Sequence, residues 1–315
     1  MSIYKTLATL KVSNVSLGAD HFGGGVKDGL AERILDAYTD FGGNFIDTAN
    51  LYGRWMPGGA NLSEQFLGRW MKKTGKHPII ATKGGHHDLH DASHKRLGEA
   101  DVRWDLESSL ATLGVDTIDF YWLHRDDLSL PIGTILEMLE SFVREGKIRH
   151  YGASNYTAAR LRAAEEYAKG HGLQGFSAVS NQHSVAKVNP GANTNPDPTL
   201  VITGEEELQF HRASGTPLIP FQATARGYFA KLASGNPLSP ELMAAYGGEE
   251  NLRLYEALAK EAEARGYSLQ TVALVAVTRE SFPVIPITSV RNEEQLSDVF
   301  RAMEQIARET QSNPI

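Results

Sequence analysis

Four polar side chains follow short apolar runs of the sequence. Asp47 ends the apolar part of "NFIDTA" and Tyr52 comes five residues later, Lys83 ends "PIIATK", and His124 ends "IDFYWLH". Taken singly, each has an ordinary structural explanation: a solvated lysine, a hydrogen-bonded histidine, or an aspartate that caps a helix. Three successive apolar runs that all end in such residues indicate a single site instead.

These four residue types make chemical sense together. The ordinary pKa of tyrosine, about 10, is too high for easy proton exchange at neutral pH, and a nearby ammonium lowers it. Lys83 can supply that ammonium, and Asp47 can pair with it, which makes the carboxylate less costly to bury. His124 can donate a hydrogen bond to a carbonyl oxygen on which negative charge develops. The set suits the reduction of a carbonyl, provided that a hydride is delivered.

The elements that must position these residues alternate along the whole chain. Apolar runs that are typical of buried strands occupy residues 15–22, 44–49, 78–83, 118–124, 150–155, 178–183, 218–223 and 284–288. Helical patterns lie between them; one ends at Gly42-Gly43, one places Val102, Leu106, Leu110 and Leu113 on a stripe, and one ends at Gly170. Eight strands that alternate with helices predict an α/β fold, a (β/α)8 TIM barrel that forms one domain over residues 1–315.

Two further features complete the predicted barrel. The segment "TLATLKVSN" before the first strand is expected to be an N-terminal β-hairpin that covers the bottom of the barrel. Long connections follow the sixth and seventh strands, at "SVAKVNPGANTNPDPTLV" and around "ASGNPLSPELMAAYGGEEN". Both leave the C-terminal ends of strands, the face where barrel active sites form, and the first is expected to be a substrate loop.

Composition limits the partners. The 315 residues carry a net charge of -7, with a pI near 5.9, which argues against nucleic acid or an anionic membrane surface as the main partner. The chain has no cysteine, which excludes disulfides, thiolate nucleophiles and iron–sulfur clusters. We find no signal-peptide pattern and no apolar run of membrane-spanning length, so a cytoplasmic protein is expected.

The motifs around these residues resemble those of the aldo-keto reductase superfamily over nearly the whole chain. "GGNFIDTANLYG" resembles the signature G-x-N-x-x-D-T-A-x-x-Y, "GKIRHYGASNY" resembles G-K-x-R-x-x-G-x-S-N, and "VIPITSVRNEEQLSD" resembles the cofactor segment near the end of the chain. The resemblance implies that Tyr52 is the general acid/base, that Lys83 and Asp47 tune its pKa, and that His124 orients the carbonyl.

The resemblance also implies a nicotinamide cofactor over the barrel mouth, although the chain has no G-x-G-x-x-G loop. Ser154, Asn155 and Gln182 would bind the carboxamide. Phe221 replaces a tyrosine that stacks on the nicotinamide ring. Arg291 matches an arginine that meets a 2′-phosphate, so NADP(H) is favoured over NAD(H). The full set of expected cofactor-binding residues is Asp47, Ser154, Asn155, Gln182, Phe221, Gln222, Thr224, Arg226, Ser289, Arg291, Gln295 and Asp298.

The substrate is expected to be a small carbonyl compound or polyol. Aromatic and basic residues near the strand ends would line its pocket: Phe22, Trp55, Trp122, Arg125 and also His87. They could stack on a sugar ring or an aromatic carbonyl and bind a carboxylate or hydroxyls; alternatively, the two tryptophans only pack the rim. The sequence specifies neither the natural substrate, nor the direction, nor the oligomeric state.

A histidine-rich segment, "GGHHDLHDASH", leaves an alternative open. His86, His90 and His94 have i, i+4 spacing, which would place them on one face of a helix as metal ligands. The preceding glycines and the internal Asp and Ser favour a polar rim loop, so no metal is expected. Besides a reductase, two other classes remain: a slow-turnover, cofactor-binding redox sensor of the same fold, and a metal-dependent barrel hydrolase.

Overall fold

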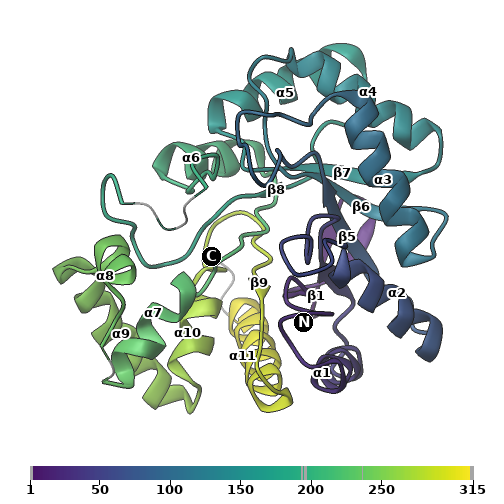
Figure 1. Ribbon diagram of the computed structural model, residues 1–315. Helices are drawn as coiled ribbons and strands as arrows, with labels where there is room; N and C mark the ends of the chain where they lie inside the picture. Colours follow the sequence, from purple (N-terminus) through teal and green to yellow (C-terminus); the bar gives the residue numbers. More distant parts are fainter. Residues whose placement is uncertain (1–2, 193, 195–196, 236, 313–315) are drawn as a thin grey trace.

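The computed structural model describes residues 3–312 apart from 193, 195–196 and 236, which include part of the expected substrate loop. Seven parallel strands form a curled sheet in the order β8-β7-β6-β5-β4-β3-β9 (Figure 1). In chain order the strands are β3 (Ser16–Gly18), β4 (Phe45–Asp47), β5 (Ile79–Gly84), β6 (Ile118–Leu123), β7 (Ile148–Ser154), β8 (Val179–Ser180) and β9 (Ile287–Thr288).

Residues around Leu218 close the barrel between β8 and the segment that leads into β9. Leu218 forms parallel bridges with Val179 on one side and with Val284 on the other. The Leu218 N–H donates to Pro283 O at 2.9 Å, and the Ile219 N–H donates to Val179 O at 2.8 Å. The two predicted strands are reduced here because proline has no N–H to donate to a ladder; the prolines are Pro217, Pro220, Pro283 and Pro286. The predicted (β/α)8 fold is confirmed.

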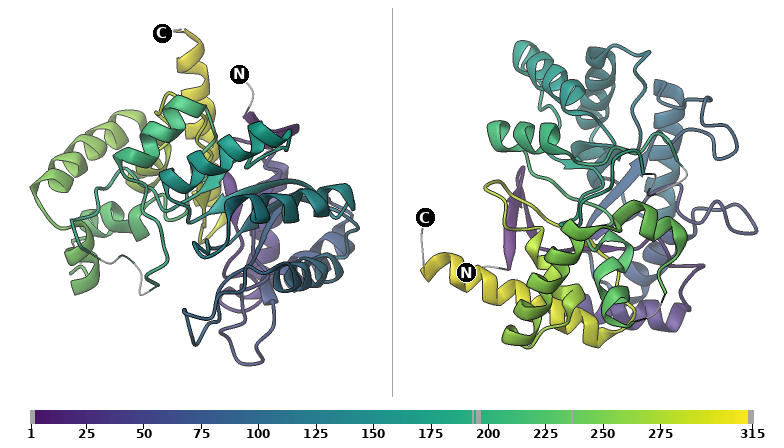
Figure 2. Two further views of the ribbon diagram at one scale, coloured as in Figure 1. Left: turned by 90° about the horizontal axis from the view of Figure 1, so that it is seen from above. Right: turned by 90° about the vertical axis from the view of Figure 1, so that its left-hand side faces the viewer.

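The expected hairpin covers the N-terminal end of the barrel. Strands β1 (Tyr4–Leu7) and β2 (Leu10–Ser13) pair antiparallel, and Leu7 and Val12 pack into the interior cluster that contains Phe45 and Phe120. Figure 2 shows the hairpin at the opposite end of the molecule from the long strand-end loops. The hairpin therefore closes the N-terminal end of the barrel, and the polar residues at the C-terminal ends of the strands lie at the opposite, open end.

Helices cover the outside of the strands. They are α1 (Asp28–Asp40), α2 (Leu62–Thr74), α3 (Glu99–Leu113), α4 (Ile132–Arg144), α5 (Ala158–His171), α6 (Glu205–Ser214), α7 (Tyr228–Ala233), α8 (Pro240–Tyr246), α9 (Glu249–Arg265), α10 (Leu269–Ala276) and α11 (Glu293–Ser312), with a 3-10 turn at Ala225–Gly227. The predicted stripe of α3 faces the core, with Val102, Leu106 and Leu113 almost fully covered and Leu110 partly buried. No helix among the described residues has the length and apolar character needed to cross a bilayer.

Two predictions about individual elements are wrong: the end of one helix and the structure of one long connection. Helix α5 does not end at Gly170 but continues to His171, and Gly172 ends it in the left-handed conformation at φ 65°. The connection expected after the seventh strand is largely helical, because Ser239 caps α8 by accepting from the Leu242 N–H and Pro240 stands at the first turn. Helices α7 to α10 form a group on one side of the barrel in Figure 1.

Candidate active site

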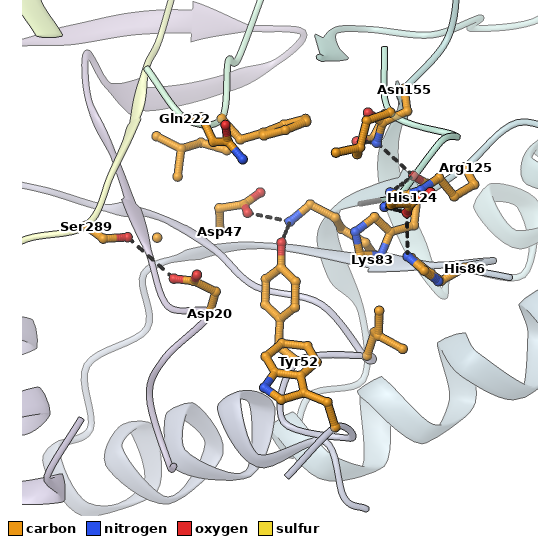
Figure 3. Close-up of a pocket in the computed structure, with 18 of the residues that line it drawn as sticks. Asp20, Asp47, Tyr52, Lys83, His86, His124, Arg125, Asn155, Gln222 and Ser289 are labelled. Atoms are coloured by element: carbon orange, nitrogen blue, oxygen red, sulfur yellow. Dashed lines mark hydrogen bonds and ion pairs between the residues drawn. The ribbon is translucent and has the colours of Figure 1, made fainter. Parts of the chain in front are cut away.

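Lys83 is the centre of the polar cluster at the strand ends. It lies near the end of β5, next to β4, which ends in Asp47. The Lys83 ammonium donates to Asp47 Oδ1, to Thr48 O at 2.8 Å and to the Tyr52 hydroxyl at 3.2 Å (Figure 3). The pairing of two neighbouring parallel strands thus brings together residues that are 36 positions apart in the chain.

The Lys83–Asp47 pair is almost completely buried, with side chains that are 3% and 4% exposed. Burial works against the charge on Lys83, but the charge of Asp47, together with the contacts of the ammonium with Asp47 and Tyr52, outweighs it and raises the pKa of Lys83. Burial raises the pKa of Asp47, and the Lys83 charge opposes that rise. Each charge is therefore tolerable only because the other is present.

A short loop carries Tyr52 over the end of β4. The Tyr52 N–H donates to Ala49 O at 3.0 Å, and Tyr52 O accepts from the Ser63 N–H at 3.2 Å. Gly53 follows with φ +102°, and a Cβ there would lie 2.6 Å from Leu62 Cβ. Only glycine fits this close approach of the loop to the start of α2.

Glu64 holds the Tyr52 loop in place through buried hydrogen bonds. Its side chain is fully buried and accepts hydrogen bonds from Thr82 Oγ1 at 2.6 Å, Asn61 Nδ2 at 2.9 Å and Asn50 Nδ2 at 3.3 Å. Asn50 and Asn61 flank the loop, and Thr82 lies on β5 beside Lys83. Sequence reasoning missed this residue, although an acid at the third position of a helix that follows the Tyr52 loop was visible.

The protonation of Tyr52 differs from the sequence prediction. Burial raises the pKa of Tyr52, while the charge of Lys83 lowers it and that of Asp47 raises it again. The predicted lowering is wrong in its net direction, because burial outweighs the ammonium. The phenol is consequently protonated at neutral pH, which is the form that donates a proton.

His124 lies directly after β6 (Ile118–Leu123), with its ring centroid 5.9 Å from that of Tyr52 in an edge-on arrangement. Burial, followed by the charge of Arg125, lowers the pKa of His124 well below its ordinary value, so the ring is neutral. The His124 carbonyl accepts from Arg125 Nη1 at 2.7 Å and from Asn155 Nδ2 at 3.1 Å. These bonds fix the backbone from which the imidazole projects.

A cavity of about 860 Å³ opens above these residues at the C-terminal end of the barrel. Asp47, Tyr52, Lys83 and His124 all line it. It is also lined by most of the expected cofactor residues: Ser154, Asn155, Phe221, Gln222, Thr224, Arg226 and Ser289. A second, mainly apolar cavity of about 320 Å³ includes Gln295 and shares Thr288 with the first.

Three of the expected cofactor residues line neither of these two cavities. Gln182 is buried and accepts from Thr194 Oγ1 at 2.8 Å, so its side chain is held beside the main cavity and does not face into it. Asp298 accepts from the Ser268 N–H at 3.0 Å, which stabilises the start of α10. Arg291 is exposed just before α11, and its N–H donates to Gln295 Oε1 at 2.9 Å.

Two of the five expected substrate-pocket residues are buried away from the main cavity. Phe22 packs edge-on against Phe66 in the outer core. Trp122 lies inside the barrel because it shares the inward face of β6 with Phe120, two residues earlier, and packs against it. Burial raises the pKa of Asp47, and Lys83 and, to a smaller extent, the Trp122 indole oppose that rise. Trp55, half-exposed, Arg125 and His87 do line the cavity.

The histidine-rich segment is a loop, as its glycines and polar residues predicted. His94 is exposed, whereas His86 and His87 are buried in the wall of the cavity beside His124. Sequence reasoning missed their partner, Asp197, whose carboxylate also accepts from Arg125 Nη2 at 2.6 Å. An acid in a long loop at the C-terminal face was the available signal.

His86, His87 and Asp197 are also the described residues that come closest to a metal site. One ligand atom from each lies within 4.8 Å of the others. Arg125 already provides a cation to the Asp197 carboxylate, however, so a metal ion would have to compete with its guanidinium.

Both the sequence and the fold resemble those of known proteins. The profile of the Aldo/keto reductase family matches residues 14–313. The norsolorinic acid reductase stcV of Emericella nidulans is 28% identical over 93% of this chain and 75% of its own length. The uncharacterized oxidoreductase YrpG of Bacillus subtilis is 28% identical over 94% of this chain and 88% of its own length.

An aryl-alcohol dehydrogenase of Pestalotiopsis microspora, GME11368, is 27% identical over 94% of this chain and 76% of its own length. Among solved structures, the thermostable aldo-keto reductase Tm1743, in complex with the inhibitor epalrestat, superposes with a TM-score of 0.69 at 20% identity, covering 96% of this chain and 94% of that one. At this identity the structural match supports the fold alone.

Proposed function

The chain belongs to the aldo/keto reductase family, a family of oxidoreductases that generally use a nicotinamide cofactor, and from this we propose that it interconverts an aldehyde or ketone and the corresponding alcohol with NADP(H). The observation that carries the proposal is the contact of the Lys83 ammonium with both Asp47 and the Tyr52 hydroxyl at the floor of the main cavity.

The proposed roles follow from charge and protonation. The protonated Tyr52 phenol donates its proton to the carbonyl oxygen as charge develops there, and Lys83 stabilises the phenolate that remains. His124, neutral and held through its carbonyl, donates a second hydrogen bond to the same oxygen. The bound cofactor would supply the hydride.

The two adjoining cavities fit an extended dinucleotide. The main cavity offers polar groups of Ser154 and Asn155 and the aromatic ring of Phe221 near the reacting centre. The second, more apolar cavity suits an adenine ring. Arg291 lies exposed at the N-terminus of the long helix α11, where positive charge and helix N–H groups favour a phosphate, and this supports NADP(H) over NAD(H).

Aromatic aldehydes are the first substrates to test. Trp55 is half-exposed at the cavity and lies edge-on to Tyr52 at 6.0 Å, and apolar residues such as Leu51 and Leu200 line the same space. The related protein GME11368 is named an aryl-alcohol dehydrogenase. We place the reaction in the cytoplasm, in keeping with the chain's composition.

The test is a screen of aldehydes, ketones and alcohols that follows cofactor absorbance with NADPH, NADH and their oxidised forms. The proposal predicts turnover of aromatic aldehydes with a lower KM for NADPH than for NADH. Arg291→Ala should raise the KM for NADPH more than that for NADH. Absence of turnover in both directions with both cofactors would contradict the proposed reaction, and a lower KM for NADH would contradict the cofactor.

A further inference from the structure

The N–H edge of the Trp122 indole faces the side of the barrel interior on which Asp47 lies. Trp122 pairs with Lys83 of β5 on one side and with Gly152 of β7 on the other. A Cβ at Gly152 would lie 2.5 Å from Trp122 Cζ3 and 2.7 Å from Cε3, so this edge of the ring rests on Gly152. The indole nitrogen is on the opposite edge of the ring, which therefore faces β5 and, beyond it, β4 with Asp47.

Packing holds the indole in this orientation. The Trp122 side chain is fully buried, and its ring centroid lies 4.5 Å from that of Phe120 at an angle of 49°. The glycine at position 152 is what allows the ring to lie so close to β7, since any larger residue there would push it aside. The direction of the N–H group is thus set by the barrel interior.

Two buried polar atoms at this place lack a regular hydrogen bond. The catalytic ammonium already uses its three N–H groups, on Asp47 Oδ1, Thr48 O and the Tyr52 hydroxyl. Among the described residues, neither Asp47 Oδ2 nor Trp122 Nε1 has a partner at regular distance and angle, and both atoms are covered from solvent. An indole N–H only donates and an ionised carboxylate only accepts, so the two atoms are complementary.

The indole already acts on the carboxylate at the distance seen here. Burial raises the pKa of Asp47, the charge and hydrogen bond of Lys83 oppose that rise, and the Trp122 N–H opposes it further. During reduction the Tyr52 phenolate attracts the ammonium that Asp47 shares with it. The carboxylate then depends more on a second donor, and the indole is the group placed to supply one.

We propose that Trp122 is a positioning residue, whose indole N–H is the second hydrogen-bond donor of the Asp47 carboxylate and keeps it ionised and directed at Lys83 while Tyr52 gives up its proton. This inference rests on the proposed carbonyl reduction and adds a buried residue to it. Trp122 touches neither substrate nor cofactor in this scheme; it acts through Asp47.

The other ionisable groups around Asp47 stay in place when the indole is changed. Lys83 of β5 and Tyr52 of the following loop contact each other and the carboxylate's pair, and Asp20, after β3, raises the pKa of Asp47 by its charge. His124, after β6, is neutral. A change that removes only the indole N–H therefore isolates the contribution of that donor.

The test replaces Trp122 by 3-benzothienylalanine, in which sulfur takes the place of the N–H in a ring of nearly the same shape. The matched control is the same replacement at Trp70 of α2, which is also buried and whose indole donates to Asp36 Oδ1 of α1 at 3.1 Å. Each variant loses one indole donor to a carboxylate, but only one of these carboxylates belongs to the catalytic pair.

The kinetic readout is the pH profile of aldehyde reduction. Without its second donor Asp47 takes up a proton at higher pH and then no longer holds the Lys83 ammonium. The acid limb of kcat should therefore move up by about one pH unit, so that kcat on that limb falls about tenfold. The KM for the cofactor should stay near the wild-type value, and the Trp70 variant should keep the wild-type profile.

Calorimetry tests the same contact without turnover. Loss of the donor lifts the pKa of Asp47 further above its unfolded value, so the Tm of the Trp122 variant should fall further below that of wild type as pH rises from about 5 to about 8. In an Asp47→Asn background the same replacement should change Tm equally at both pH values.

The outcomes separate the two proposals. A Trp122 variant with the wild-type pH profile, or with a Tm difference that is the same at both pH values, would overturn the inference, and so would shifts of equal size in the Trp70 variant. If no aldehyde is reduced, the proposed reaction fails, and calorimetry alone decides: a Tm difference that grows with pH supports the contact, and a constant one overturns it.

Discussion

Replacing Lys83 by methionine should destabilise the protein and change how its stability depends on pH. The ammonium is the counter-charge of a carboxylate that is only 4% exposed, and it also binds Thr48 O. Methionine fills much of the same volume but leaves Asp47 buried without a partner. Breaking a buried ion pair in this way typically costs about 3–5 kcal/mol.

The corresponding fall in melting temperature follows from the size of the chain. Unfolding entropy of about 2.1 cal/mol/K per residue gives about 0.66 kcal/mol/K for 315 residues. A loss of 3–5 kcal/mol therefore lowers Tm by about 5–8 °C. Differential scanning calorimetry or circular dichroism measures this shift.

The sign of the pH effect follows from the burial of Asp47. Burial already raises the pKa of Asp47 against the opposing charge of Lys83, and without Lys83 nothing in that pair opposes it. An acid whose pKa is higher in the folded than in the unfolded protein costs stability as pH rises from its unfolded pKa through its folded one. The defect of Lys83→Met should therefore grow from mildly acidic to mildly alkaline pH.

A double variant provides the control. Lys83→Met combined with Asp47→Asn removes both charges, and it should recover part of the stability and lose the added pH dependence. An unchanged Tm in Lys83→Met, or a defect that shrinks as pH rises, would refute the account of a buried pair held together by its own charges.

Three other predictions concern the Tyr52 loop and the N-terminal hairpin. Gly53→Ala should lower stability by about 1–3 kcal/mol and reduce kcat, since a Cβ meets Leu62, whereas Gly58→Ala at φ +100° in open space should cost less; equal losses would contradict this. Glu64→Gln should cost about 1–3 kcal/mol in thermal unfolding and loosen the Tyr52 loop. Burial lowers the pKa of Lys5 to about 8, so wild type should gain stability relative to Lys5→Met as pH rises from about 8 towards 10.5; a constant difference would refute this.

The sequence predicted the barrel and the grouping of the four polar residues because strand order alone determines both. Asp47, Lys83 and His124 end successive parallel strands, so pairing of β4, β5 and β6 brings them to one face whatever the details of the loops. The same logic predicted which residues follow the strands into the main cavity.

The other features of the site depend on where each side chain points and how deeply it is buried, and local sequence patterns encode neither. Trp122 and Lys83 are paired residues on neighbouring strands and both are buried, yet only Lys83 lines the main cavity, which the sequence could not show. The protonation of Tyr52 depends on the balance between burial and the Lys83 charge, and only the structure gives the burial. Asp197 reaches Arg125 from 72 residues away through a loop without a repeating pattern.

The central claim is that Tyr52 is the proton donor, and Tyr52→Phe tests it most directly. The variant loses one hydroxyl while keeping its ring, so NADPH binding, measured by quenching of tryptophan fluorescence, should stay near the wild-type value. Single-turnover reduction of an aromatic aldehyde should slow by about 10²–10⁴-fold, the usual contribution of a general acid. A Tyr52→Phe protein that reduces the aldehyde at close to the wild-type rate would contradict the account.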